Sequence, residues 1–416
     1  MKTIFGLLVT SDTPEVIEKA FNLQKSLYKK ISKTFEEFFI VDLTNFTLFK
    51  KKKLYNNKSL NNFTLPHNFK VITPENKYEL NKFLVDKSLV AFDGVGKSLD
   101  RFRILFLIKK YNIRLIYLSN IGYGNHYLGK RIFKKGGEIS LKNHFFILKK
   151  IIVYCLIKIM ILLNLFSRID IYFESNKTIV NNCNNSLAKK IEKIFPFLKI
   201  CYFKKIIHIN PRAFDTSTKL KLNLSEDKIV FIDSDFDNGD RIIRDGRPTE
   251  ELRLKYFTQL SQFLLELSNI FNKKITICLH PKTNLETYKK YLGAFELCKF
   301  QTTENIRQAF IVVFHSSTAI YEAIFLKKKI ISLKSNTLGE HMANMINYHQ
   351  KLYGLFSYSL DEKKELNKNL LQAELEKITE NYNHYIKGMM NENSTLGEDK
   401  VIDTIKKEYI INNVRF

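Results

Sequence analysis

The chain has 416 residues, more than one ordinary hydrophobic core accommodates, so two domains are expected. Hydrophobic residues make up 45% of it, which excludes a disordered chain and indicates a globular protein. The formal net charge of +25 favours anionic partners, namely phosphorylated donors, nucleic acid or a lipid surface, although a Lys-, Asn- and Ile-rich chain is also what an AT-rich genome produces.

The first half of the chain alternates short apolar runs with longer amphipathic stretches, the pattern of an α/β protein. The polar segment 209–227 is typical of a linker between domains. Strands are expected over 3–9, 38–43, 69–73, 88–92, 113–118, 169–173 and 199–203, and helices over 14–30, 98–111, 144–166 and 186–195.

The second half repeats this alternation, which predicts a second parallel sheet covered by helices on both faces. Residues 361–393 and 400–408 are charged and helical in pattern, and we expect them to pack across the back of the domains. Expected strands are 228–232, 275–279, 310–314 and 328–333, and expected helices are 249–270, 284–291 and 318–326. The predicted domains are 1–210 and 220–375, followed by C-terminal helices over 376–416.

Cysteine usage and the N-terminus indicate a cytoplasmic protein. The five cysteines are scattered and form no CxxC pair, so they read as reduced residues rather than a disulfide framework or zinc site. The N-terminal segment lacks the length and cleavage pattern of a secretion signal. The apolar stretch 145–166 is interrupted by lysines, so it predicts either a buried helix or a helix lying on the inner face of the plasma membrane, where the contact is peripheral.

Two polar clusters stand where apolar runs end. His280, Pro281 and Lys282 follow the run 275–279, and Pro281 fixes His280 in an extended conformation at the strand end. A histidine there can donate to a phosphate oxygen, and Lys282 adds a positive charge, although a histidine at a strand end is often structural.

The run 310–314 is followed by His315, Ser316, Ser317 and Thr318, at the start of an expected helix. The hydroxyls serve as helix caps or as phosphate donors, and two serines with a threonine exceed what a cap needs. Glu322, one turn later, is suited to accept from ribose hydroxyls or simply to stabilise the helix.

Acidic residues follow three other expected strands. Asp233 directly follows strand 228–232, and with Asp235 and its neighbours it suits a divalent metal, a catalytic carboxylate or a polar turn; we favour a catalytic Asp233 and no metal. Asp93 begins a segment ending in Gly96-Lys97-Ser98, which partly matches a phosphate-binding P-loop, and it is a candidate base. Glu174 ends strand 169–173 and is either a catalytic or a surface carboxylate.

The order strand-His-Pro, then strand-His-Ser-Ser-Thr-helix, resembles GT-B glycosyltransferases that use CMP-activated acidic sugars. Within that group, the segments around Asp233, His280 and His315 look most like retaining β-Kdo transferases, with the sialyltransferase and polysialyltransferase group second. The resemblance implies an α/β GT-B fold, in which two Rossmann-like domains face a cleft. The N-terminal domain would bind the acceptor and the C-terminal domain the nucleotide sugar.

The resemblance also implies roles for the site residues. His280 and the hydroxyls after residue 315 would hold the CMP phosphate without a metal or other cofactor, and Asp233 would be the nucleophile that forms a covalent intermediate, assisted by Glu174. The partners implied are a Kdo-like CMP-sugar and a capsule or lipopolysaccharide glycan, not nucleic acid. The inverting sialyltransferase scheme would instead use Asp93 as base, but Phe92 replaces the first acid of its motif.

Three alternatives stay open at the level of sequence. A CDP-glycerol type polymer transferase also uses His-Pro and Ser-Ser elements. A basic, non-enzymatic protein that binds membranes or nucleic acid would show salt-sensitive binding. A P-loop kinase would bind ATP through Lys97.

Overall fold

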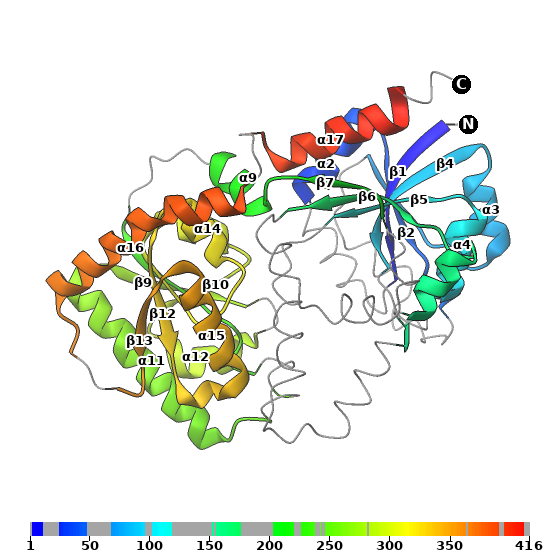
Figure 1. Cartoon of the computed structure of the whole chain (residues 1–416). Helices are drawn as coiled ribbons and strands as arrows, with labels where there is room; N and C mark the ends of the chain where they lie inside the picture. Colours follow the sequence, from blue (N-terminus) through cyan, green and yellow to red (C-terminus); the bar gives the residue numbers. More distant parts are fainter. Residues whose placement is uncertain are drawn as a thin grey trace. The chain divides into compact units, whose positions relative to one another are not determined.

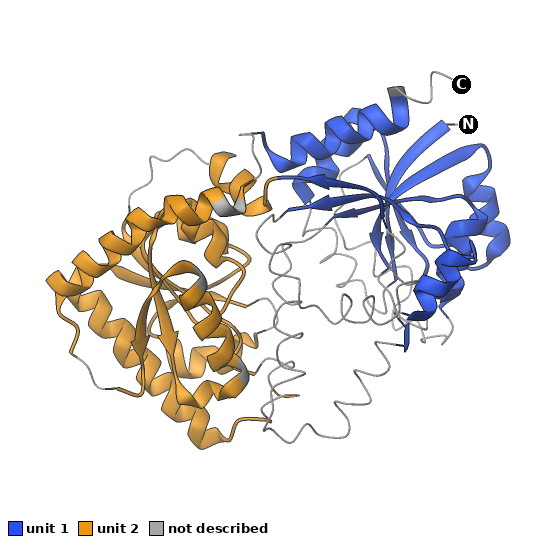
Figure 2. Ribbon diagram, viewed as in Figure 1, with its two compact units in different colours: residues 1–209, 393–416 blue, residues 210–392 orange. Residues whose placement is uncertain are grey.

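The computed structural model describes thirteen stretches of the chain, and every structural statement below concerns them. They are residues 2–10, 25–47, 68–95, 102–118, 152–153, 155–175, 203–219, 226–237, 242, 246–280, 283–362, 365–390 and 395–411. The chain forms two compact units, shown in Figure 2. Unit 1 comprises residues 1–209 and 393–416, and unit 2 comprises residues 210–392.

Unit 1 is built on a seven-stranded parallel sheet in the order β3-β2-β1-β4-β5-β6-β7 (Figure 1). Its strands are mostly buried on both faces, as apolar runs in a covered parallel sheet should be. The strands are β1 (Lys2–Val9), β2 (Phe38–Asp42), β3 (Phe69–Ile72), β4 (Lys87–Gly94), β5 (Arg114–Leu118), β6 (Ile169–Glu174) and β7 (Phe203–His208).

Helices cover both faces of this sheet. One core cluster joins α4 and the helical residues 155–162 to one face, and a second joins α2 and α17 to the other. The ion pair of Lys30 with Asp399, at 2.6 Å, adds a polar contact between α2 and α17. These helices are α2 (Lys25–Phe35), α3 (Lys77–Leu84), α4 (Phe102–Lys110) and α17 (Gly397–Lys406), with short turns η1 (Thr44–Phe46) and η7 (Lys407–Ile411).

Unit 2 is built on a six-stranded parallel sheet in the order β10-β9-β8-β11-β12-β13. The strands are β8 (Lys228–Ile232), β9 (Lys274–Leu279), β10 (Glu296–Lys299), β11 (Ala309–Phe314), β12 (Lys329–Lys334) and β13 (Phe356–Ser359). The helices are α9 (Arg212–Lys219), α11 (Glu250–Phe271), α12 (Leu285–Leu292), α13 (Thr302–Gln308), α14 (Ile320–Phe325), α15 (Gly339–Tyr353) and α16 (Lys368–Met389), with the turn η6 (Asn336–Leu338).

The core of unit 2 forms where α11 packs on the sheet. Phe257, Leu260 and Leu264 of α11 join Phe231 of β8 and Ile277 of β9 in one buried cluster. Thr249 caps the helix by accepting from the amide of Leu252, and Asn272 ends it in the left-handed conformation. This cluster fixes β8 and β9, whose carboxyl ends carry the predicted site.

The α/β class with two Rossmann-like parallel sheets is therefore confirmed, with two corrections to the elements. The predicted strand 199–203 ends too early, because β7 continues from Phe203 to His208, and residues 199–202 lie outside the described residues. The predicted linker 209–227 contains helix α9, which packs on α14 through a ring contact of Phe214 with Phe325. The predicted helix 186–195 and residues 14–24 of the predicted helix 14–30 lie outside the described residues.

Candidate active site

The site of unit 2 lies where its strand order reverses. Numbered within the unit, the strands run 3-2-1-4-5-6, so successive connections leave β8 and β11 in opposite directions. In such sheets ligands bind in the crevice beyond the carboxyl ends of the two strands that flank this switch point. Asp233 follows β8 there, and His315 follows β11.

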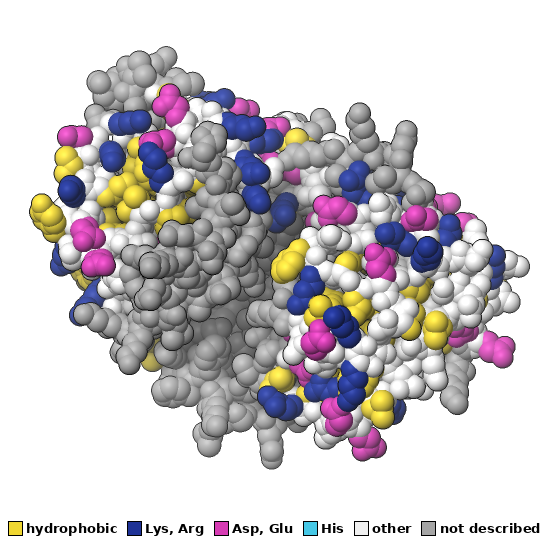
Figure 3. All heavy atoms as spheres, turned by 180° about the vertical axis from the view of Figure 1, so that it is seen from behind, with side chains coloured by type: hydrophobic (Ala, Val, Ile, Leu, Met, Phe, Trp, Pro, Cys, Tyr) yellow, Lys and Arg dark blue, Asp and Glu magenta, His cyan; other side chains and the backbone are white. Residues whose placement is uncertain are grey.

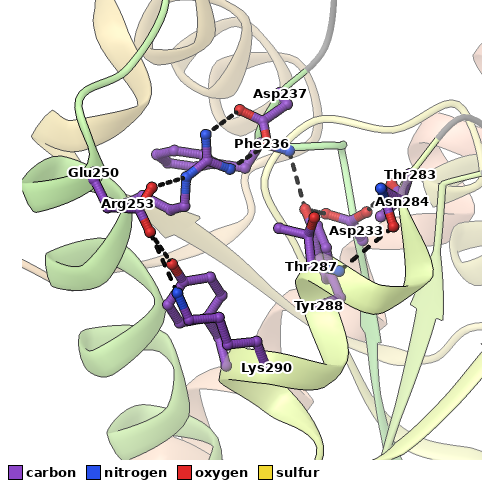
Figure 4. A network of polar contacts seen from close by, with 11 residues as sticks. Asp233, Phe236, Asp237, Glu250, Arg253, Thr283, Asn284, Thr287, Tyr288 and Lys290 are labelled. Carbon is purple, nitrogen blue, oxygen red and sulfur yellow. Dashed lines mark hydrogen bonds and ion pairs between the residues drawn. The ribbon is translucent and has the colours of Figure 1, made fainter.

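Asp233 is the centre of the loop after β8 and is only 3% exposed. Its Oδ1 accepts from the Asp235 amide at 3.0 Å and the Tyr288 hydroxyl at 2.8 Å. Its Oδ2 accepts from the His280 amide at 3.2 Å and the Thr283 hydroxyl at 2.8 Å. Burial raises the pKa of this carboxyl, and the four donors partly offset that rise. Asp233 thus ties together the loops after β8 and β9 and helix α12, as Figure 4 shows in part.

His280 stands beside a second buried carboxylate. The Nδ1 of His280 is 3.9 Å from Oδ2 of Asp235, whose side chain is 8% exposed, whereas that of His280 is 32% exposed. Burial, with the nearby charge of Asp233, raises the pKa of Asp235, and His280 opposes that rise. Asp235 adopts a left-handed backbone, φ 62°, which aspartate tolerates better than most residues. The partly exposed imidazole of His280 can donate a ring N–H to an anion.

A direct hydrogen-bond link joins the loops on both sides of the switch point. The Ser234 hydroxyl donates to the carbonyl oxygen of Ser316 at 2.8 Å and accepts from its amide at 3.3 Å. The Ser316 hydroxyl is buried and has no hydrogen-bond partner among the described residues. Ser317 accepts from the amide of Ala319 at 3.3 Å, and Thr318 is exposed. The predicted hydroxyls therefore stand together at the edge where the strand order reverses.

His315 has a different environment from the one its predicted ligand role requires. It is 1% exposed, and its Nδ1 lies 3.0 Å from the carbonyl oxygen of Leu333. A carbonyl only accepts, so Nδ1 donates, and Nε2 forms a second hydrogen bond with the Tyr256 hydroxyl at 2.8 Å. The imidazole fixes the loop after β11 onto β12 and α11 instead of presenting a nitrogen to a ligand.

Glu322 also has a partner within unit 2. Its carboxylate accepts from the Thr303 hydroxyl at 2.6 Å, which joins α14 to α13. Burial raises the pKa of Glu322, while Arg212 lowers it. The predicted contact of Glu322 with a ribose stays a prediction. It requires the carboxylate to accept from the ribose and from the Thr303 hydroxyl at the same time.

A polar network that sequence reasoning missed supports the loop after β8. Arg253 of α11 binds Asp237 through both terminal nitrogens and Glu250 through Nε at 3.0 Å, and its guanidinium lies 5.8 Å from the ring centre of Phe236 (Figure 4). The amide of Phe236 donates to the Tyr288 hydroxyl at 3.0 Å. No local motif distinguishes Arg253 from other surface arginines, because its partner lies sixteen residues earlier.

Unit 1 holds the other two predicted catalytic residues. Asp93 is the last but one residue of β4, which lies beside β1 at the switch point of this sheet, and it accepts from the amide of Val95 at 3.1 Å. Glu174 ends β6 and pairs with His208 of β7 at 3.3 Å. Burial raises the pKa of Glu174, and His208 counteracts it.

Some predictions have no counterpart among the described residues. Pro281 and Lys282 lie outside them, as does the loop around Lys97. Within the described stretches, no group of three or more His, Cys, Asp or Glu side chains is arranged to hold a metal ion. No helix in those stretches is long and apolar enough to cross a bilayer.

Comparisons with known proteins give a likeness in structure only. No known sequence family and no curated protein matches the chain. The calicheamicin glycosyltransferase CalG4 has 9% identity and a TM-score of 0.47, with 98% of each chain covered. The UDP-GlcNAc 2-epimerase of Methanocaldococcus jannaschii has 12% identity and a TM-score of 0.44, covering 98% of this chain and 100% of its own. The wall teichoic acid polymerase TagF has 11% identity and a TM-score of 0.47, covering 100% of this chain and 90% of its own. Scores below 0.5 say nothing about what this chain binds or transfers.

Proposed function

We propose that the chain is a GT-B glycosyltransferase that moves a Kdo-like acidic sugar from a CMP donor to a capsule or lipopolysaccharide glycan. The observation that carries the proposal is the 2.8 Å bond of Ser234 to Ser316, which joins the two switch-point loops beside His280. An imidazole and hydroxyls at the carboxyl ends of strands beside a switch point suit the phosphate of a nucleotide.

In this proposal His280 is the main donor to the phosphate. Its imidazole is partly exposed, and its Nδ1 lies 3.9 Å from Oδ2 of the buried Asp235. When the sugar departs, the phosphate gains negative charge, and an N–H of the imidazole directed at it stabilises that charge. The unpartnered Ser316 hydroxyl and the exposed Thr318 add donors at the same edge.

For Asp233 we propose a positioning role in place of the predicted nucleophilic one. A nucleophile needs an oxygen directed at the anomeric carbon, yet each Asp233 oxygen already accepts two hydrogen bonds, and the residue is buried. Attack would require the bond to Thr283 or Tyr288 to break first. Without a nucleophilic Asp233, the inverting alternative is the scheme we propose, with Asp93 as the base that takes the proton of the acceptor hydroxyl and Glu174 as an assisting carboxylate.

Nucleotide binding tests the proposal. CMP should raise the melting temperature of the wild-type chain more than CDP, UDP or ATP does. The substitution His280→Asn should weaken CMP binding about 10- to 100-fold, which corresponds to the free energy of one hydrogen bond to a charged group. His384→Asn is the matched control, because His384 is an exposed histidine of α16. Preference for CDP would favour a CDP-glycerol donor, and no nucleotide binding at all would end the proposal.

Transfer is then measured directly. CMP release from CMP-Kdo and from CMP-sialic acid, with a capsule or lipopolysaccharide fragment as acceptor, identifies the sugar class. The anomeric configuration of the product, read by proton NMR, distinguishes a retaining from an inverting enzyme. Release of CMP from neither donor would contradict the proposed substrate class even if CMP binds.

A further inference from the structure

Unit 1 exposes a cluster of large apolar side chains on two neighbouring helices. Residues 152–153 and 155–162 are helical, and their inner face, with Val153, Ile157 and Ile161, is buried in the core. Their outer face is apolar as well. The exposed members, called the apolar patch below, are Phe106 of α4 with Ile152, Leu156, Ile159, Leu162, Leu163 and Leu165, each 36–60% exposed.

The patch is continuous along the helix. Ile152, Leu156, Ile159 and Leu163 are spaced by three or four residues and so share one face. Contacts across the end of the helix join it to α4, since Lys109 donates to Asn164 at 2.8 Å. A helix on the surface of a soluble domain normally directs polar residues outward, so an apolar outer face marks an interaction surface.

The surroundings of the patch are positively charged. Among the described residues 102–118, 152–153 and 155–168 there is no Asp or Glu, and Arg103, Lys109, Lys110 and Arg168 are exposed. On α4, Arg103 and Lys110 are exposed and share the face of Phe106. Hydrophobic side chains with Lys and Arg beside them also occur on the face of unit 1 that Figure 3 draws.

We propose that the apolar patch binds the surface of an anionic lipid bilayer, with its apolar side chains at the acyl boundary and the lysines and arginines among the headgroups. Apolar and cationic groups on one helical surface are what such binding needs. A second copy of the chain is a poorer occupant, because a two-fold contact would bring the same cations together. The patch consists of residues of unit 1 and includes none of the switch-point residues of unit 2, so this inference does not rest on the proposed function.

Because the chain has no tryptophan, one can be introduced as a reporter. In Leu163→Trp, the indole should shift its emission to the blue and be quenched by brominated lipid when vesicles containing phosphatidylglycerol are added. Pure phosphatidylcholine vesicles should bind far more weakly, and added salt should weaken binding to the anionic ones.

Sedimentation with the same vesicles tests the patch itself. The triple variant Leu156→Ser, Ile159→Ser, Leu163→Ser should bind on the order of 100-fold more weakly, because three side chains lose burial in lipid. The matched control replaces Phe300 and Leu370 of unit 2 by serine; they are 78% and 69% exposed, and binding should be unchanged. If the triple variant and the control variant bind the anionic vesicles equally well, the proposal is overturned. It is also overturned if the wild-type chain and the control variant are dimers in solution and only the triple variant is a monomer. Circular dichroism confirms that each variant is folded, and nucleotide binding by the triple variant should stay at the wild-type level.

Discussion

Replacing Asp233 by asparagine is the most direct test of how the site is held. The asparagine side chain keeps one accepting oxygen, but an NH2 group replaces the second carboxylate oxygen. If it replaces Oδ2, it faces the two donors that Oδ2 accepted from, the His280 amide and the Thr283 hydroxyl. Two buried donors without an acceptor cost about 2–6 kcal/mol together. Removal of a buried charge offsets part of this, because burial raises the pKa of Asp233. We expect a net loss of about 2–4 kcal/mol in the unfolding free energy of unit 2.

Urea unfolding followed by far-UV circular dichroism gives this number. Hydrogen exchange over residues 274–292 should show faster exchange at the His280 amide. Asp227→Asn is the control, because Asp227 is exposed at the opposite end of β8. An Asp233→Asn variant within about 0.5 kcal/mol of wild type would refute the anchoring argument.

The same variant separates the two roles considered for Asp233. A positioning residue predicts that CMP binding weakens together with stability, since the His280 loop loses its anchor. A nucleophile predicts intact CMP binding and a sugar–protein adduct that mass spectrometry detects on the wild-type chain. Such an adduct on Asp233 would exclude the positioning role as its main one.

Two further variants test the packing on which both units depend. Burial lowers the pKa of His349 to about 4, so the unfolded chain takes up the proton first, and stability falls as the pH drops from 7 towards 4. Between pH 7 and pH 5 the loss of unfolding free energy amounts to about 2 kcal/mol. Urea titrations of His349→Phe should lack this part of the pH dependence. A pH profile equal to that of wild type would contradict the burial argument. Gly94→Ala should lower the stability of unit 1 by about 1–3 kcal/mol, because the added Cβ lies 2.5 Å from the carbonyl oxygen of Leu8. A melting temperature equal to that of wild type would show that this strand end is not closely packed.

The strands that carry the site could be predicted from sequence because they are fully buried. β8, β9 and β11 are predominantly apolar runs, each followed directly by a polar residue, so both their positions and their ends are visible in the pattern. β10 and β13 were missed, since they are edge strands whose residues are only partly buried. Helix α9 was missed because its sequence is polar and resembles a linker.

The roles of individual site residues could not be predicted in the same way. The pattern places Asp233 and His315 at strand ends, but it says nothing of the Tyr288 and Tyr256 hydroxyls that occupy them, 55 and 59 residues away along the chain. Whether a polar side chain at a strand end holds a ligand or a neighbouring loop depends on such distant partners.

Unit 2 is an insertion within unit 1, because α17 returns to pack on the sheet where the chain began. During synthesis, all of unit 2 emerges from the ribosome before the residues that complete unit 1. Until Val401, Ile402 and Ile405 arrive, the face of the first sheet that holds Phe5 lacks part of its cover. A premature stop codon after residue 392 would therefore leave unit 2 complete but deprive unit 1 of its C-terminal helix, although most of unit 1 is encoded at the start of the gene.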